Sequence, residues 1–206
     1  MRTFAPASLR RGIAVGALAL ALGLGGCAAA NAPAGSSAEP GTSTGSSTAA
    51  SEANAADQMF VTMMIPHHQQ AVEMADMLLA KPDADERVLE LAQRIKDAQG
   101  PEIEQMQAWL DDWGMPMETG GGGHGGMGHG DGMMSDDDMA ALEEASGAEA
   151  SRLFLEQMIV HHEGAVEMAE DEVEDGAHPD VVALARQMAD AQTAEIAEME
   201  ALLEQL

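Results

Sequence analysis

The sequence predicts an all-α protein, a four-helix bundle assembled from two helical hairpins of duplicated sequence. Outside its glycine-rich stretches the 206-residue chain consists largely of Ala, Leu, Met, Glu and Gln, which favour helices, and only 2% of its residues are aromatic. Hydrophobic residues recur at intervals of three and four positions, as in packed helices. A unit of about 55 residues occurs twice, and two copies are too few for a solenoid. Together these observations favour a bundle of two hairpins.

The duplication is clearest in two segments of thirteen residues. MMIPHHQQAVEMA runs from Met63 to Ala75, and QMIVHHEGAVEMA runs from Gln157 to Ala169. Farther along each copy, the pattern Q-x-x-E-I-x-x-M occurs from Gln99 to Met106 and from Gln192 to Met199. The spacing between the copies is nearly the same for both patterns, so we interpret the duplicated unit as a whole hairpin.

The N-terminal residues predict export rather than a part of the fold. An apolar run from Gly12 to Leu24 follows three arginines and is too short to span a membrane, which indicates a signal peptide over residues 1–26. The only cysteine, Cys27, follows LGG and resembles the lipidated cysteine of a bacterial lipobox. This predicts a lipid anchor at the extracytoplasmic face of the cell membrane or periplasm. The alternative is a plain signal peptide with an incidental cysteine. Residues 27–56, rich in Ala, Ser, Gly and Thr, predict a flexible tether.

The rest of the chain predicts the elements of the bundle in order. A first helix carries His67 and His68 on a wide apolar face, turns at KPDAD and is followed by a returning helix. A glycine-rich linker follows, and Ser135 then has the character of an N-cap for a short helix from Asp136 to Ala145. The second hairpin turns at EDGAHPD. The predicted divisions are residues 57–113 for the first hairpin, 114–134 for the linker and 135–206 for the short helix and second hairpin, with 57–206 as one bundle domain.

The charge of the chain restricts its partners. The formal net charge is −27, and removal of residues 1–26 with their three arginines makes it about −30. Such a surface repels nucleic acid and anionic lipid headgroups, so we predict no nucleic-acid partner. No thiol remains free after lipidation, and the bundle helices contain no Glu-x-x-His motif of the kind that di-iron bundles use. We therefore predict that the protein is not an enzyme and has no organic cofactor.

Antiparallel hairpins would place polar side chains of each copy in one layer. His67 is expected beside Gln99 and about one turn from Glu102, and His161 beside Gln192. An unsatisfied buried polar group costs about 1–3 kcal/mol, so internal partners or a ligand must satisfy the layer. A polar network that holds the helix register and a metal site are both compatible with the spacing. The layer consists of Met64, His67, His68, Gln99, Glu102 and Met106 in the first copy, and of Met158, His161, His162, Gln192, Glu195 and Met199 in the second.

If the layer binds a metal, its donor atoms point to copper. Thioether sulfur favours Cu(I) and Ag(I), imidazole suits copper among other metals, and no thiolate is available. The linker repeats this chemistry on a glycine-rich backbone, and we interpret it as a second place of metal capture. The alternative is a low-complexity spacer. The linker candidates are Met115, Met117, His124, Met127, His129, Met133 and Met134.

The doubled His-His segments, each followed by the Q-x-x-E-I-x-x-M pattern, resemble a bacterial family catalogued as domain of unknown function three-zero-five. The resemblance covers roughly residues 55–206 and excludes the linker insert. It implies a ferritin-like four-helix fold, a secreted or lipid-anchored location and, as in some members, copper binding and copper resistance. Carried over residue by residue, it implies as candidate ligands Met64, His67, His68, Met74, Met158, His161, His162 and Met168.

The second copy departs from the first where Val160 replaces Pro66 and where Thr193-Ala194 replaces Gly100-Pro101. Because a proline removes a helical N–H and can kink a helix, the two copies are expected to differ in geometry.

These observations predict an extracytoplasmic, lipid-anchored bundle that binds copper, with Ag(I) as a further ion, and that serves its sequestration, homeostasis or resistance. The main alternative is a structural or partner-binding bundle with a polar core of His, Gln and Glu and no physiological metal. A ferritin-like redox enzyme is a third, weaker interpretation.

Overall fold

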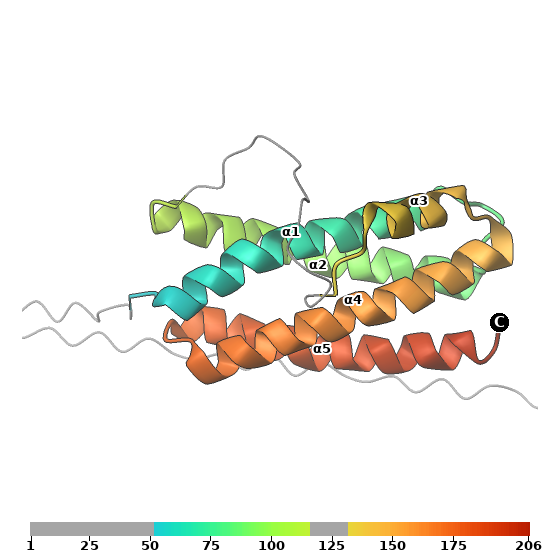
Figure 1. Ribbon diagram of the computed structural model, residues 1–206. Helices are drawn as coiled ribbons and strands as arrows, with labels where there is room; N and C mark the ends of the chain where they lie inside the picture. Colours follow the sequence, from blue (N-terminus) through green and yellow to red (C-terminus); the bar gives the residue numbers. More distant parts are fainter. Residues whose placement is uncertain (1–51, 116–131) are drawn as a thin grey trace, which may run out of the picture. The chain divides into compact units, whose positions relative to one another are not determined.

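The computed structural model describes residues 52–115 and 132–206, and every regular element in these ranges is an α-helix (Figure 1). The predicted all-α bundle is therefore confirmed. The predicted signal peptide, Cys27, the tether and linker residues 116–131 lie outside the described residues. The helices are α1 (Ala55–Leu79), α2 (Glu86–Asp112), α3 (Asp136–Glu144), α4 (Gly147–Asp175) and α5 (Pro179–Leu203).

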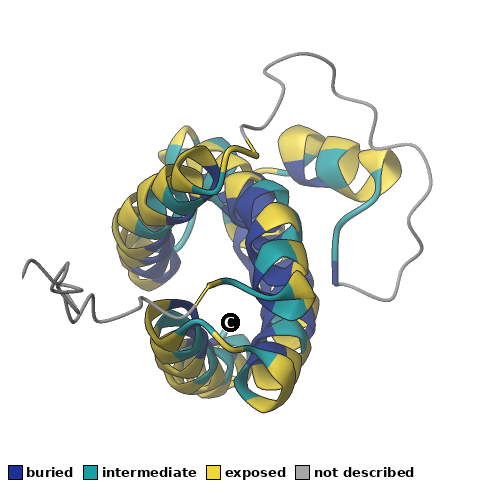
Figure 2. Ribbon diagram, turned by 90° about the vertical axis from the view of Figure 1, so that its left-hand side faces the viewer, coloured by how far each residue is buried: buried dark blue, intermediate teal, exposed yellow. Residues whose placement is uncertain are grey.

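The four long helices form two hairpins, α1 with α2 and α4 with α5, and the contact between the hairpins is made mainly by α1 and α4 (Figures 1 and 2). The first histidine pair lies on α1 and the second on α4, so the central helix pair brings the two copies of the motif together. The short α3 packs on the outside of α1 and α4 and contributes only one buried residue, Leu142.

Local sequence explains where the helices begin. Asn54 caps α1 in a capping box with Asp57, and Ser135 caps α3 in a capping box with Asp138. Pro179 opens α5, where a missing backbone N–H costs nothing. Each side-chain cap satisfies backbone N–H groups that have no partner within the helix.

Two prolines lie inside helices of the first copy, Pro66 in α1 and Pro101 in α2, and both helices run on without interruption. None of the described helices is long and apolar enough to cross a membrane.

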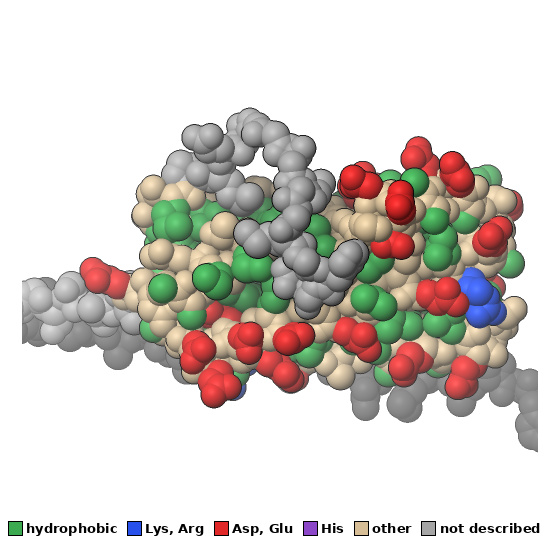
Figure 3. All heavy atoms as spheres, in the orientation of Figure 1, with side chains coloured by type: hydrophobic (Ala, Val, Ile, Leu, Met, Phe, Trp, Pro, Cys, Tyr) green, Lys and Arg blue, Asp and Glu red, His purple; other side chains and the backbone are tan. Residues whose placement is uncertain are grey.

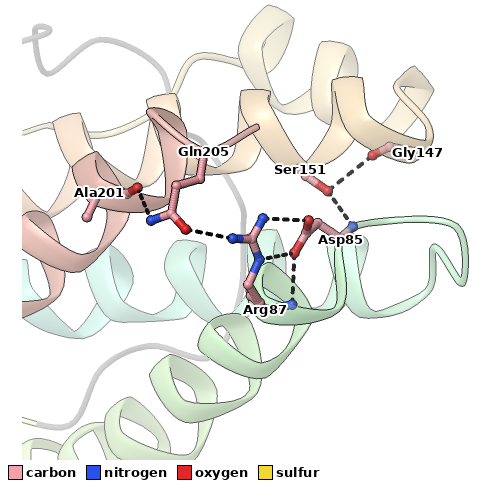
Figure 4. Close-up of polar contacts among 6 residues, drawn as sticks. All are labelled: Asp85, Arg87, Gly147, Ser151, Ala201 and Gln205. Atoms are coloured by element: carbon pink, nitrogen blue, oxygen red, sulfur yellow. Dashed lines mark hydrogen bonds and ion pairs between the residues drawn. The ribbon is translucent and has the colours of Figure 1, made fainter.

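One end of the two hairpins is clasped by polar side chains (Figure 4). The Asp85 backbone N–H donates to the Ser151 hydroxyl at 2.8 Å, which connects the α1–α2 turn to α4. Arg87 donates to the Asp85 carboxylate through Nε at 3.0 Å and Nη2 at 2.9 Å, and through Nη1 to the Gln205 side chain at 2.9 Å. The guanidinium of Arg87 lowers the pKa of Asp85. The clasp fixes the start of α2 relative to α4 and the end of α5.

The buried residues face the interior of the bundle (Figure 2) and form two hydrophobic clusters. The first cluster includes Leu91 and Phe154, and the second includes Phe60 and Leu110. Along α1, Met64 belongs to the second cluster and Met74 to the first, and the histidines lie between them. Along α4 the order is reversed, with Met158 in the first cluster and Ala165 in the second. The two helices are therefore antiparallel, and the histidines form a polar layer that divides an otherwise apolar core.

Candidate functional site

All four motif histidines are buried, with at most 1% of any side chain exposed. Adjacent residues on a helix point about 100° apart, so the two members of each pair face different neighbours. The first members, His67 and His161, face each other across α1 and α4 with ring centroids 3.7 Å apart. The second members, His68 and His162, face the partner helix of their own hairpin. The two copies thus share one layer, whereas the sequence predicted one layer for each hairpin.

A His–Glu hydrogen bond closes each hairpin at this layer. Nε2 of His68 lies 2.9 Å from Oε2 of Glu102, and Nε2 of His162 lies 2.7 Å from Oε2 of Glu195. Each glutamate remains partly exposed, at 19% for Glu102 and 22% for Glu195, whereas the imidazoles are fully enclosed. The carboxylate accepts and the ring nitrogen donates, so in the neutral form of the ring Nδ1 is the acceptor. Nδ1 of His68 and of His162 has no hydrogen-bond partner in the structure.

His161 is held as a neutral imidazole. Burial lowers its pKa well below the ordinary value of 6.5, and the charges of His67, His162 and His68 lower it further. The His67 backbone opposes this shift through a hydrogen bond but does not outweigh burial, and neither ring nitrogen of His161 has a hydrogen-bond partner in good geometry. A neutral imidazole with a free lone pair is the form of histidine that binds a metal ion.

The candidate thioethers lie on both sides of the histidine layer, and each hydrophobic cluster contains one from each copy. Met64 shares the second cluster with Met168, and Met74 shares the first cluster with Met158. The antiparallel course of α1 and α4 causes this exchange. Met168 is partly buried, and the other three are completely enclosed.

The remaining members of the predicted layer are also enclosed. Met106 and Met199 are fully buried, one in each cluster. Gln99 and Gln192 are buried, and both side-chain carbonyl oxygens are without a hydrogen-bond partner. Buried acceptors without donors are costly, which leaves the layer open to a cation as well as to water.

The donor set suits a soft ion and not a hard one. Within residues 52–115 and 132–206, no group of three or more His, Cys, Asp or Glu side chains is arranged to hold a metal ion. The donors at the histidine layer are imidazole nitrogens with thioether sulfurs on both sides, the combination that Cu(I) and Ag(I) prefer.

Only the ends of the linker are described. Met115 is 40% exposed at the end of the first hairpin, and Met133 and Met134 are partly buried before α3. The other linker candidates, Met117, His124, Met127 and His129, lie outside the described residues. The structure does not bring Met115 together with the histidine layer, whereas Met134 is bonded to Gln70 on α1.

A buried carboxyl pair at the far end of the bundle was not anticipated from sequence. Asp57 accepts backbone hydrogen bonds from Asn54 at 2.6 Å and from His178 at 2.8 Å. Burial raises the pKa of Asp57, but these and further hydrogen bonds outweigh burial and lower it overall. Burial, followed by the hydrogen bond to Asp57 and the charges of Asp57 and Asp175, raises the pKa of Glu172 to about 8. A single glutamate within a helix gave no signal of this contact.

The outer surface is acidic. Figure 3 shows rows of Asp and Glu side chains across the visible face, with very few Lys or Arg and no histidine among the coloured atoms. A negative surface attracts cations and repels polyanions. The four motif histidines, which are buried, lie beneath this acidic surface.

The chain is similar to proteins of one family. The family model described as domain of unknown function (DUF305) matches residues 57–203. A solved DUF305 fragment from Deinococcus radiodurans is 34% identical, with a TM-score of 0.66 over 75% of this chain and 99% of that chain. A DUF305 protein from Streptomyces coelicolor, described as secreted, is 34% identical, with a TM-score of 0.65 over 73% of this chain and 93% of that chain.

Structures of CopM are also similar. CopM in its Cu(I)-bound form is 31% identical, with a TM-score of 0.60, and in its Cu(II)-bound form 35% identical, with a TM-score of 0.62. Each comparison covers 72% of this chain and 96% of that chain. CopM has also been solved in Ag-bound forms. No curated protein sequence matches the chain at a significant level.

Proposed function

Because the chain belongs to the DUF305 family, we propose that it is an extracytoplasmic copper-binding protein that sequesters or buffers the ion. One observation carries the proposal: four enclosed histidines meet in one layer, with thioethers on both sides. The similarity to CopM, which was solved with Cu(I), Cu(II) and silver, supports copper over other ions that imidazole accepts. A role in copper homeostasis or resistance follows from such binding.

The ligands that we propose are the eight residues of the duplicated motif. The two histidines that bond to glutamate would bind through Nδ1, because Nε2 donates to the carboxylate. Such a second bond fixes the orientation of a metal-binding imidazole and raises its basicity. Glu102 and Glu195 would therefore orient the ligands without binding the ion. The proposed ligands are Met64, His67, His68, Met74, Met158, His161, His162 and Met168.

The proposal includes a location and excludes a reaction. We propose that Cys27 carries a lipid that anchors the chain at the extracytoplasmic face of the membrane, as the LGGC sequence predicts. We propose no enzymatic activity, because the layer offers metal donors and no nucleophile or acid–base pair directed at a cleft. Metal ions and the membrane lipid are the partners in this proposal.

A metal-free structural core is the second candidate, and the two His–Glu hydrogen bonds favour it. They connect α1 to α2 and α4 to α5 without any ion. In that case the histidines would hold the register of the two hairpins, and copper chemistry would belong to the linker.

Equilibrium titration of the mature chain with Cu(I), against a competing chelator under anaerobic conditions, separates the two candidates. Replacement of His67, His68, His161 and His162 by alanine should abolish the tightest class of binding. His178→Ala is the matched control, since this histidine lies at the α4–α5 turn beside two tryptophans. Deletion of residues 116–131 should reduce only the amount of copper bound in weaker sites. Full-affinity binding by the four-alanine protein would establish the structural core instead.

Binding should also stabilise the fold. A ligand present at a hundred times its dissociation constant stabilises the native state by about 2.7 kcal/mol. The melting temperature of the wild-type chain and of His178→Ala should rise on addition of Cu(I) or Ag(I), and that of the four-alanine protein should not.

A further inference from the structure

Residues 132–134, the last residues of the predicted linker before α3, are hydrogen-bonded to α1 and lie against α4. The Gln70 side chain on α1 grips the backbone of Met134: its Nε2 donates to the Met134 carbonyl at 2.9 Å, and its Oε1 accepts from the Met134 N–H at 2.7 Å. Only 8% of Gln70 is exposed, so this pair of hydrogen bonds is largely shielded from water. Such a pair of bonds fixes the direction of the segment as well as its position.

The other end of this segment lies directly on the backbone of α4. Gly132 has a φ of +73°, and a Cβ atom at this position would lie 2.6 Å from the carbonyl oxygen of Val160 and 3.1 Å from the Cα of Gly164. Neither neighbour is a flexible side-chain end, so no side chain fits. The segment therefore needs a glycine at position 132, and it meets another glycine, Gly164, on α4.

The repeat shows why the contact lies at the histidine layer. Gln70 and Gly164 occupy equivalent positions of the two copies, each three residues after the first histidine of its pair, His67 or His161. Residues three apart on a helix lie on the same face. In Figure 1 the segment descends from α3 toward α4 where α4 runs beside α1. The first copy supplies the Gln70 side chain, which holds the segment, and the second copy supplies the space beside Gly164, in which the segment lies.

We propose that residues 132–134 are a strap that controls access to the facing rings of His67 and His161, with Gln70 and Gly164 as its positioning residues. The second histidine of each pair is hydrogen-bonded toward its own hairpin, to Glu102 or Glu195. In the proposal, the strap closes the remaining, outer side of the central pair. Its release requires that both bonds to Gln70 break. The strap would set how fast a soft metal ion enters and leaves the layer. This consequence rests on the proposed function, whereas the control of access to the two rings is independent of it.

Gln70→Leu tests the strap, because leucine has a similar volume and cannot form the two bonds. The first measurement uses no metal: diethyl pyrocarbonate modifies accessible neutral imidazoles, and peptide mass spectrometry gives the rate at each histidine. The rate at His67 and His161 should rise by about tenfold to a hundredfold, the range for loss of two hydrogen bonds. Gln69→Leu, at the exposed neighbouring position, is the matched control and should leave the rates unchanged.

The second measurement is the rate of Ag(I) transfer from the loaded chain to an excess of chelator. Entry and release should both accelerate in Gln70→Leu, while the equilibrium affinity stays close to that of the wild type, because the strap lies over the loaded and the empty layer alike. Gly164→Gln gives the second copy the residue that the first copy has at the equivalent position, Gln70. Its side chain would occupy the space in which Gly132 lies, so this variant should also exchange Ag(I) faster.

Unchanged modification rates in a folded Gln70→Leu protein would overturn the proposal. So would a rise that is equal at all histidines and accompanied by a lower melting temperature, since that indicates global unfolding. If no metal binds, the modification rates still test the strap. If the rates stay unchanged while Ag(I) binds tightly, the strap is wrong and the proposed function stands.

Discussion

Replacement of Glu172 by glutamine should stabilise the protein at alkaline pH. The Glu172 side chain is 2% exposed, and the carboxylate of Asp57 beside it already accepts backbone hydrogen bonds from Asn54 and His178. A protonated Glu172 donates to Asp57, whereas an ionised Glu172 places a second negative charge against it in a buried site. Glutamine has the same shape and can donate from its amide at every pH.

The magnitude follows from the pKa of Glu172, which is raised from 4.5 to about 8 in the folded chain. Between these two pH values the folded state holds a proton that the unfolded state has lost, so the free energy of unfolding falls as the pH rises, and it is constant again above the folded pKa. The complete difference has an upper limit of about 5 kcal/mol, and the part between about pH 6 and about pH 9 is roughly 2–3 kcal/mol. Because Asp57 and Glu172 titrate as a pair, the measured value should lie below these limits.

Urea unfolding of the wild type and of Glu172→Gln at a series of pH values measures this difference. The free energies of unfolding of the two proteins should separate in favour of Glu172→Gln as the pH rises from 6 to 9. Glu174→Gln, an exposed change on the same helix, should follow the wild type at every pH. Parallel curves for the wild type and Glu172→Gln would refute the assignment of a buried proton to this pair.

Three further outcomes are expected. Glu102→Leu together with Glu195→Leu should weaken Cu(I) binding by about tenfold to a hundredfold in a chelator titration, because leucine cannot accept the bonds that orient the second histidines. Met64→Leu with Met158→Leu should lower the affinity for Ag(I) while costing less than about 1.5 kcal/mol of stability for each change in urea unfolding, because the volume is nearly conserved. Cys27→Ser should leave an unprocessed precursor that incorporates no radiolabelled palmitate. Normal cleavage of this variant would indicate a plain signal peptide instead.

Local sequence was sufficient to predict the helices and to predict that both histidine pairs are buried. The spacing of apolar residues assigns a buried face to each helix, and both histidines of each pair fall on that face because it is wide. The cap at Ser135 and the short helix after it were likewise predictable, since a capping box depends on residues three positions apart. The duplication further implied that whatever one copy buries, the other buries as well.

The relation between the two hairpins was not predictable in the same way. Periodicity gives the face of a helix but not the rotation or the offset at which it meets another hairpin. The sequence therefore suggested two separate layers, whereas the structure joins them through the contact of His67 with His161. The bond between Gln70 and Met134 and the pairing of Asp57 with Glu172 also connect residues far apart in the chain.

By itself, then, the sequence determined that this protein is a duplicated helical bundle with histidine, methionine and glutamine in its core, because helix periodicity and repeat identity depend on neighbours within a few turns. The tertiary structure decided which of these side chains meet. It placed Met64 and Met168 in the same hydrophobic cluster and directed His68 toward Glu102, because the antiparallel packing of α1 on α4 and the closure of each hairpin act between segments that sequence spacing does not relate.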